Sequence, residues 1–244
     1  MTTGACRSVP ARDAWREGTD HELAWWHDWL ANRGGAWPDN YDFRLDPESC
    51  LQHDVMRHLD PRQTALRILD VGAGPLTSLG KCWPGHEVEI TAVDALADEY
   101  TNLLMDCGID PPIRTLRCDS EQLAERFPRN SFDLAYARNA LDHAYEPMSA
   151  IEQMVELVRP EGVLLLEHYA NEGEHAKYVG LHQWNFDIVD GACLLWQPGR
   201  LFNVADELGS RATVAGEKTE LPRMPQIARD RSYGWVRIIA RVNA

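Results

Sequence analysis

The ten residues 65–74, which read ALRILDVGAG, constrain the fold of this chain more than any other stretch. Their apolar side chains form a nearly continuous run, typical of a strand that is buried on both faces of a parallel sheet. This run consists of Leu66, Ile68, Leu69 and Val71. Asp70 places a carboxylate near the carboxyl end of the strand. Gly72 and Gly74 then end it, because glycine allows a sharp turn and lets a ligand approach the backbone amides closely.

Asp94 ends the next predicted strand, over residues 88–94. A carboxylate in this position can accept hydrogen bonds from both hydroxyls of a ribose, as in the dinucleotide-binding fold. The two acidic strand ends therefore predict a nucleoside-containing cofactor at the carboxyl edge of an α/β sheet. A dinucleotide fingerprint needs a third small residue where this chain has Thr77, so the spacing argues against a nicotinamide oxidoreductase.

Strands and helices alternate through the middle of the chain, which is typical of a parallel, doubly wound sheet with right-handed crossovers. Strands are predicted over residues 65–70, 88–94, 114–118, 132–137 and 163–168, and helices over residues 76–82, 98–107 and 147–158. Two further strands are predicted over residues 212–215 and 234–242, with a helix over residues 200–208 before them.

Residues 65–169 resemble the class I S-adenosylmethionine-dependent methyltransferases, in their small-molecule branch. Asp70, Gly72 and Gly74 match the first motif of that family, D/E-x-G-x-G-x-G, although Leu76 replaces the third glycine. Residues 132–143 match its fourth-strand motif, and the L-x-P-G-G turn follows with Glu161 in place of the first glycine. The resemblance implies a Rossmann-like, seven-stranded, mostly parallel sheet, closed by an antiparallel hairpin, and S-adenosylmethionine as the cofactor.

The resemblance also implies the residues that contact the cofactor. Asp94 matches the acid that binds the ribose, and Asp119 matches the acid that accepts from the adenine amino group. Arg138 follows the fourth strand and is equally compatible with a substrate anion or a surface ion pair. The full expected cofactor set is Asp70, Gly72, Gly74, Asp94, Ala95, Asp119, Ser120 and Arg138.

His143 is the candidate catalytic residue, because it lies just beyond the fourth strand, at the edge where open α/β sheets bind ligands. An imidazole can take the proton of an incoming hydroxyl or amine. The alternative is a histidine that only shapes the pocket. A metal site built from Glu172, His175 and His182 matches no known ligand spacing, so no metal is expected.

Two segments lie outside the shared core, and we expect them to cover the active site. Residues 1–18 are predicted to be a flexible tail, and residues 19–60 an N-terminal helical lid segment that starts at a capping box, Thr19 to Glu22. Within it, residues 36–45 are expected to be a loop, and a second helix is expected to start at Asp46. The methyltransferase domain then spans residues 61–244.

The second segment, residues 170–198, is predicted to be an insertion after the fifth strand, with a hairpin around Asp190 and Gly191. We expect the two segments to meet over the methyl group and form the acceptor pocket; the alternative is that both only pack on the helices of the sheet. The expected substrate residues are Trp25, Trp29, Asn139, His168, Tyr178, His182 and Trp184.

Composition limits the function classes. The chain has 244 residues, with 24 Lys and Arg against 38 Asp and Glu, a net charge of −14. That charge argues against a nucleic-acid partner, since affinity for nucleic acid rests largely on basic side chains that meet phosphates. Six scattered cysteines without a C-x-x-C pair indicate reduced thiols rather than a disulfide framework or a zinc site. No signal peptide or membrane span is predicted, so we expect a cytoplasmic monomer or homodimer without a membrane partner.

The sequence therefore predicts an S-adenosylmethionine-dependent methyltransferase that acts on an oxygen or nitrogen of a small metabolite by in-line transfer, with general-base help from His143. The alternative is a regulatory or non-catalytic protein that keeps the fold and the cofactor pocket. Leu76 and Glu161, the two departures from the family motifs, are the residues that leave this alternative open.

Overall fold

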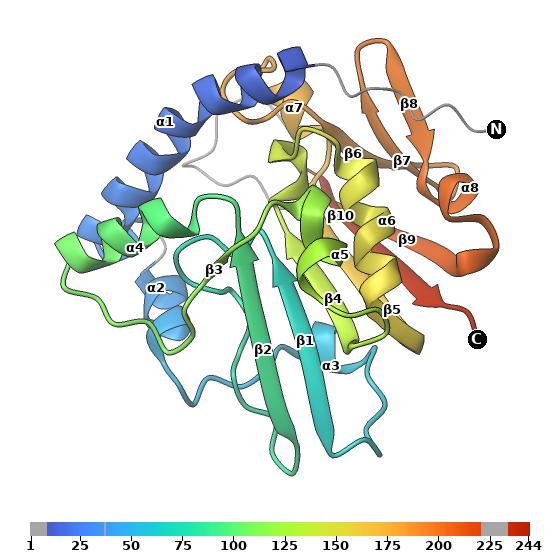
Figure 1. Cartoon of the computed structure of the whole chain (residues 1–244), viewed down its shortest axis with the longest axis horizontal. Coiled ribbons are helices and arrows are strands. Elements are labelled where there is room, and N and C mark those ends of the chain that lie inside the picture. Colours follow the sequence, from blue (N-terminus) through green and yellow to red (C-terminus); the bar gives the residue numbers. More distant parts are fainter. Residues whose placement is uncertain (1–8, 37, 221–233) are drawn as a thin grey trace.

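A seven-stranded sheet forms the centre of the computed structural model, which describes residues 9–36, 38–220 and 234–244 (Figure 1). The strand order is β3-β2-β1-β4-β5-β10-β9. The strands are β1 Ala65–Val71, β2 Glu87–Asp94, β3 Leu116–Arg117, β4 Phe132–Arg138, β5 Val158–Tyr169, β9 Ala212–Glu220 and β10 Gly234–Val242. The first five are parallel, and β10 runs antiparallel to both β5 and β9. The doubly wound, mostly parallel sheet predicted from the sequence is therefore confirmed.

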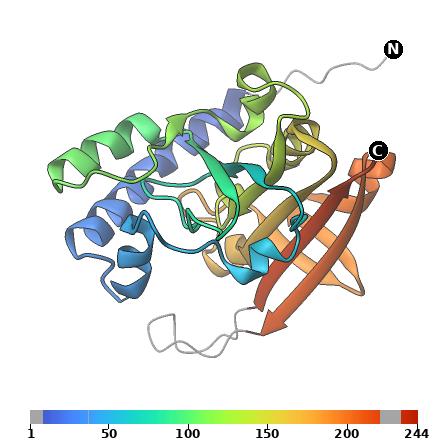
Figure 2. The same ribbon diagram turned by 90° about the horizontal axis from the view of Figure 1, so that it is seen from below.

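The helices surround this sheet (Figures 1 and 2). They are α1 Val9–Ala31, α2 Pro38–Leu45, α3 His53–Met56, α4 Ala97–Asp106, α5 Leu123–Arg126, α6 Pro147–Leu157, α7 Glu172–His175 and α8 Val204–Leu208. A second, three-stranded antiparallel sheet contains β6 Asn185–Val189, β7 Ala192–Gln197 and β8 Arg200–Asn203. None of the helices in the described part of the chain combines the length and the apolar character that crossing a membrane requires.

The central strand β1 is buried on both faces, as its apolar run predicts. Leu69 and Val71 belong to a core cluster with α5, α6, α8 and the small sheet. Leu66 and Ile68 point the other way, into a second cluster with α3. Successive side chains of a strand point to opposite faces, so this division requires that both faces be covered. The carboxyl end of β1 is thereby held rigidly at the edge where the site lies.

The predicted helix over residues 76–82 is wrong. The segment instead runs beside residues 49–52, and its backbone groups are used there. The amides of Lys81 and Cys82 both donate to the Ser49 carbonyl, at 2.7 and 3.0 Å. A Cβ at Gly80 would overlap the backbone of Cys50, so only glycine permits this close approach. Tertiary hydrogen bonds thus replaced the helical ones.

The N-terminal boundaries also differ from the prediction. Helix α1 begins at Val9 and continues through Thr19, whose hydroxyl donates to the Arg16 carbonyl at 2.8 Å rather than capping a helix start. The predicted flexible tail is therefore wrong over residues 9–18, and residues 1–8 lie outside the described part. The expected loop over residues 36–45 contains α2, which starts at Pro38, a residue that suits the first turn of a helix.

A turn, and not a helix, follows Asp46, whose side chain accepts from the amide of Glu48 at 2.9 Å. Only the short helix α3 forms after it.

The predictions for two residue ranges near the C-terminus have different outcomes. The predicted hairpin over 185–196 is confirmed, with Asp190 and Gly191 at φ angles of 50° and 82°. The predicted helix over 200–208 is correct only in its second half, because residues 200–203 pair with β7 as strand β8.

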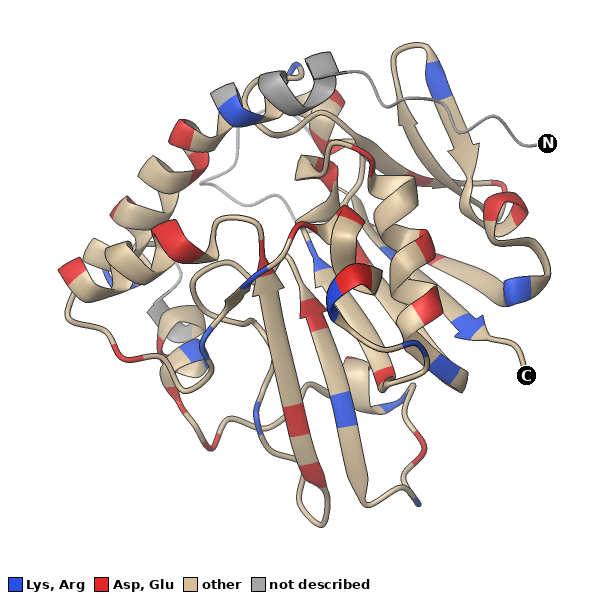
Figure 3. Ribbon diagram, viewed as in Figure 1, with Lys and Arg blue, Asp and Glu red and all other residues tan. Residues whose placement is uncertain are grey.

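The cysteines that the structure describes are free thiols, and Cys6 lies outside the described part. Charged residues of both signs are distributed over helices and strands alike (Figure 3). Exposed ion pairs contribute little to stability, so we expect the stability of the fold to depend mainly on its buried apolar clusters.

Replacement of Leu69 by alanine tests this dependence. Leu69 is fully buried in β1, so Leu69→Ala should lower the free energy of unfolding by about 2–5 kcal/mol, through lost burial and the cavity left behind. Leu201→Ala is the matched control: that side chain is 66% exposed, and its removal should change stability by no more than about 0.5 kcal/mol. Urea denaturation followed by circular dichroism measures both, and equal losses would contradict this account.

Candidate active site

A cavity of about 820 Å³ opens at the carboxyl ends of β1, β2 and β4. The strand ends and the loops after them form one wall. Helix α1 and the segment that follows β5 form the opposite wall. Most of the residues expected from the sequence line this one cavity: Trp25, Trp29, Asp70, Gly72, Gly74, Asp94, Ala95, Asp119, Ser120, Arg138, Asn139, His143 and His182.

The glycine turn after β1 packs closely against Ala140 on one side and Trp26 on the other. Gly72 and Gly74 have φ angles of 71° and 66°, in the left-handed region that favours glycine. A Cβ at Gly72 would overlap the Ala140 side chain, and one at Gly74 would lie 2.6 Å from the Trp26 ring. Both glycines are thus required by packing as well as by backbone conformation, and the cradle they leave suits the close approach of a ligand.

Asp70 is held at the end of β1 by the residue that breaks the dinucleotide spacing. The Thr77 hydroxyl donates to Asp70 Oδ2 at 2.5 Å, and Thr77 Oγ1 accepts from the Leu79 amide at 3.1 Å. Burial raises the pKa of Asp70 to about 6. Thr77 therefore has a structural role that the glycine spacing did not predict.

Asp94 joins two loops at the end of β2. Its Oδ2 accepts from the Gly74 amide at 3.0 Å, and its Oδ1 accepts from the Leu96 amide at 2.9 Å. Burial raises the pKa of Asp94 to about 6 despite these hydrogen bonds. The carboxylate lines the cavity and has lone pairs left over, as acceptance from ribose hydroxyls requires.

The expected adenine end of the cavity follows β3. Asp119 and Ser120 line it, and the Ser120 hydroxyl donates to Glu121 Oε2 at 2.9 Å. Glu121 is buried, and its Oε1 accepts from the Glu146 amide at 2.9 Å, which ties this loop to the start of α6. The residues present therefore fit an adenosine-containing cofactor along β1, β2 and β3.

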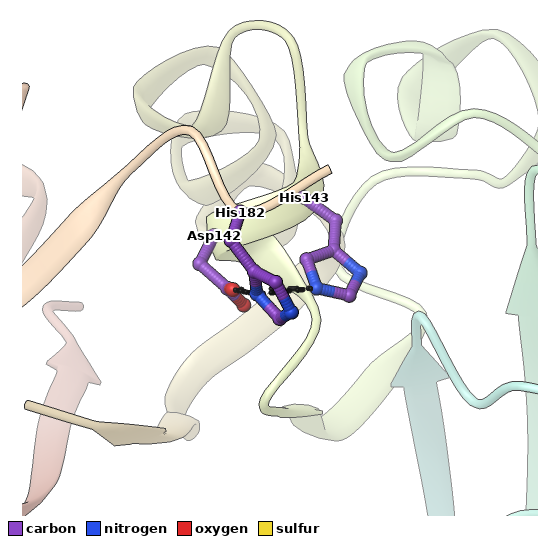
Figure 4. Close-up of side chains that lie close together, drawn as sticks. All are labelled: Asp142, His143 and His182. Carbon is purple, nitrogen blue, oxygen red and sulfur yellow. Dashed lines mark hydrogen bonds and ion pairs between the residues drawn. The ribbon is translucent and has the colours of Figure 1, made fainter. Parts of the chain in front are cut away.

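A cluster of one carboxylate and two imidazoles lies on the cavity wall after β4 (Figure 4). Asp142 and His143 belong to the short helical turn Leu141–His143, and His182 comes from the loop before β6. His182 Nδ1 lies 2.7 Å from Asp142 Oδ2 and 2.9 Å from His143 Nε2. Sequence positions 39 and 40 residues apart are thus brought into direct contact.

Burial and neighbouring charges shift the pKa values of the carboxyl and imidazole groups in and beside this cluster. Asp142 is buried, yet the histidines around it hold its pKa below the usual range of a carboxyl. Burial lowers the pKa of His182, but the hydrogen bond with Asp142 and the negative charges of Asp142, Glu172 and Glu22 together outweigh burial and raise that pKa to about 9. Burial raises the pKa of Glu172, in the same cavity, to about 7.

The loop that carries His182 is fastened to the sheet edge and to α1. The amides of Gln183 and Trp184 both donate to the Asp142 carbonyl, at 3.1 and 3.2 Å. A Cβ at Gly18 of α1 would lie 2.6 Å from the Leu181 side chain. The N-terminal segment and the segment after β5, which the sequence predicts to cover the active site, therefore contact each other beside the cavity.

Aromatic side chains of α1 form the wall opposite the strands. Trp25 is half exposed and stacks against Trp29, with centroids 6.4 Å apart. Trp26 Nε1 donates to Glu22 Oε1 at 2.8 Å. The Arg44 guanidinium lies 5.6 and 5.5 Å from the centroids of the Trp26 and Trp29 rings, a cation–π arrangement.

Sequence reasoning missed several residues of the cavity, among them Glu22 and Arg44. Helical spacing from the tryptophans indicates the face that carries Glu22, since it lies four residues before Trp26. Arg44 reaches the cavity only through the packing of α2 against α1 and the 76–82 segment. No pattern in the sequence predicts that packing.

Three of the expected substrate residues do not line the cavity. Trp184 is 1% exposed, packs in the core cluster and lies under the Arg200 guanidinium. The Tyr178 hydroxyl accepts from Asn185 Nδ2 at 3.2 Å. His168 is buried, with its ring stacked on Phe186 at 3.9 Å. Substrate contact of these three residues stays a prediction, and their absence from the cavity lining does not support it: in an irregular segment the sequence does not show which side chains point inward.

Arg138 lies at the margin of the cavity, between two partners. Its guanidinium is 3.8 Å from Glu167 Oε2 and 5.1 Å from the centroid of the Trp235 ring. Next to it, Asn139 has a φ of 48°, and its side-chain oxygen accepts from the Tyr169 amide at 3.3 Å. Contact of Arg138 with the cofactor stays a prediction.

Comparison with known proteins agrees with this geometry. Residues 69–166 match the family model of a methyltransferase domain. A region of 120 residues is 27% identical to the sterol 24-C-methyltransferase erg-4 of Neurospora crassa, and covers 45% of this chain but only 31% of that enzyme. The solved phosphoethanolamine N-methyltransferase 2 of Haemonchus contortus superposes with a TM-score of 0.53 at 14% identity, over 88% of this chain and 59% of that one. The structural likeness confirms the fold, and the matched residues 69–166 resemble a methyltransferase domain.

Calorimetry with S-adenosylhomocysteine tests the role of Asp94. Asp94→Ala should weaken binding about ten- to a hundredfold, since loss of a charged hydrogen-bond partner costs roughly 1.5–3 kcal/mol. Asp98→Ala, on the exposed side of α4 and outside the cavity, is the matched control and should bind as the wild type does. Wild-type affinity in Asp94→Ala would contradict the assignment of Asp94 as a cofactor-binding residue.

Proposed function

We propose that this chain, a class I S-adenosylmethionine-dependent methyltransferase, transfers the methyl group to an oxygen or nitrogen of a small metabolite by in-line displacement. One observation carries the proposal: a single cavity is lined both by the cofactor motif residues and by aromatic, imidazole and carboxylate side chains. A cofactor and a compact acceptor can therefore lie in contact within it.

The residues of the sheet edge would hold the cofactor. Gly72 and Gly74 would receive its close approach, Asp94 the ribose and Asp119 the adenine amino group. When bound, S-adenosylmethionine supplies a methyl group on a sulfonium sulfur, open to in-line attack by an acceptor lone pair.

The coverings exclude water and orient the acceptor. Helix α1 and the loop at residues 179–182 form the wall that faces the strand ends. Trp25 offers a flat apolar surface, while Glu22 and Glu172 offer carboxylates. These features support an acceptor with a planar or apolar body and a hydroxyl or amino group. The net charge of −14 supports a small metabolite over nucleic acid.

His143 is placed to assist removal of the proton from the acceptor. It lines the cavity, and its Nε2 lies 3.4 Å from Asp142 Oδ2. Its Nδ1 lies 3.8 Å from Glu22 Oε2 on the α1 side. The ring is therefore held between two carboxylates from opposite walls.

The two departures from the family motifs support an enzyme over a non-catalytic relative. Leu76 is buried among the aromatic residues of α1, α2 and α4, and so fills a packing position. Glu161, near the start of β5, has a φ of 65°, which lies in the left-handed region that favours glycine. Neither residue lines the cavity, so neither substitution removes a group that the transfer needs.

The direct test is formation of S-adenosylhomocysteine. The purified chain is incubated with S-adenosylmethionine and a panel of small alcohols, phenols and amines, and the product is quantified by mass spectrometry. Turnover with one acceptor class supports the proposal. Tight binding of S-adenosylhomocysteine without turnover on any panel member would favour the regulatory alternative.

His143→Ala should lower turnover by about a hundredfold, because general-base assistance contributes roughly this factor, while S-adenosylhomocysteine binds as before. His27→Ala, on an exposed part of α1 outside the cavity, is the control. Full activity in His143→Ala would mean that proximity alone carries the transfer.

Trp25→Ala should raise the Michaelis constant of the acceptor and leave the affinity for S-adenosylhomocysteine nearly unchanged. The half-exposed ring lies on the wall opposite the strand ends, so its removal takes apolar contact from the acceptor alone. Loss of one such contact is expected to cost about tenfold. An unchanged Michaelis constant would place the acceptor elsewhere.

A further inference from the structure

Three donor atoms from two separate segments converge at the His143 side of the cavity. They are Asp142 Oδ2, His143 Nε2 and His182 Nδ1, and Figure 4 shows them directed toward one another. The three separations are 2.7, 2.9 and 3.4 Å. Asp142 is buried, while both imidazoles line the cavity.

A single proton cannot form good hydrogen bonds among all three atoms. His182 Nδ1 has one in-plane direction, which carries either a hydrogen or a lone pair. Asp142 Oδ2 and His143 Nε2 both lie within hydrogen-bond distance of that single atom. One hydrogen cannot lie on the line to both partners, so at least one contact is bent and weak. A cation between the three atoms would satisfy all of them at once.

The spacing also suits a first-row metal ion. In an octahedral site with ligands at about 2.1 Å, neighbouring donor atoms are about 3.0 Å apart. The three observed separations bracket that distance. Two histidines and one carboxylate on one face of an octahedron form a known ligand set for divalent metals, and leave the remaining positions open.

The surroundings of the cluster favour a cation. Among the described residues, Asp142 Oδ1 and both ring nitrogens of His168 are buried without a hydrogen-bond partner, and His168 Nδ1 lies 3.8 Å from Asp142 Oδ1. The Oε2 atom of Glu172, in the same cavity, likewise has no hydrogen-bond partner. Glu22 Oε2 faces His143 Nδ1 at 3.8 Å, the second-layer carboxylate that metal-binding histidines commonly have.

We propose that Asp142, His143 and His182 bind one divalent first-row transition-metal ion, whose open positions face the cavity. The inference rests on the proposed function for its role: the ion would take an oxygen of the acceptor and lower its pKa, as metals do for bound water. His143 then assists the acceptor as a ligand of the ion rather than as a free base. This replaces the expectation, drawn from the Glu172, His175 and His182 spacing, that no metal is bound.

Cobalt(II) is the probe, because its visible absorption reports coordination independently of methyl transfer. The full chain is treated with a chelator, freed of it, and titrated with Co²⁺ in the absence of cofactor and acceptor, with calorimetry alongside. We expect one ion per chain. His182→Ala and His143→Ala should each weaken binding by at least about tenfold. His27→Ala, the control outside the cavity, should bind as the wild type does.

Binding of S-adenosylhomocysteine by each variant shows that it is folded, and His182→Gln provides a second variant that preserves more of the side-chain volume. Absence of binding by Co²⁺, Zn²⁺ and Mn²⁺, or equal binding by the wild type and the cluster variants, would overturn the metal site. Methyl transfer that persists in the chelator-treated chain would leave the proposed function standing and remove the role of the ion. Cobalt binding without any methyl transfer would do the reverse.

Discussion

The carboxylate of Asp94 is the contact on which the site depends, because it joins the turn after β1 to the loop after β2. Its two oxygens accept from the amides of Gly74 and Leu96. The amides of Gly72 and Ala73 also donate to the Val93 carbonyl, at 2.9 and 3.1 Å, so the two adjacent strand ends are held in one geometry. The cost is a buried negative charge, which is why the pKa of Asp94 is raised. Cationic or hydroxyl groups of a ligand at this edge would relieve that cost.

The glycine turn shows how the N-terminal helix becomes part of the site. Gly74 has no room for a side chain because the Trp26 ring lies against it. Trp26 in turn holds Glu22 by a hydrogen bond, and Glu22 faces His143 from the opposite wall. A continuous series of contacts therefore leads from the cofactor turn through α1 to the imidazole cluster. Substitution of Trp26, which touches both the cofactor turn and Glu22, is expected to affect both cofactor and acceptor for this reason.

The small sheet β6–β8 has a different role, which is to support the loop that carries His182. Gly216 of β9 permits close packing of this sheet, since a Cβ there would lie 2.6 Å from Cys193 Sγ and 2.7 Å from Ile188 Cδ1. Trp184, two residues after His182, is buried and packs with residues of the same sheet. Burial of Trp184 anchors the loop, and the two amides that donate to the Asp142 carbonyl set its position. His182 is thereby held against Asp142.

Local patterns in the sequence determined the sheet and the cofactor edge. The apolar run that ends at Asp70 and the acid at Asp94 each depend on neighbours within a few residues, and the order of parallel strands brings their carboxyl ends together. The same reasoning placed His143 at that edge. It failed for residues 76–82 and for α2, where hydrogen bonds and packing between distant segments override local preference.

Only the tertiary structure decided how the acceptor side is built. Whether Trp184 or His182 points into the cavity depends on the path of an irregular loop, which the small sheet and Asp142 determine together. The contact between His143 and His182 joins positions 39 residues apart, and no periodicity links them. A sequence determines its strand ends through short-range burial patterns, whereas the meeting of side chains from two loops follows from the packing of the whole chain.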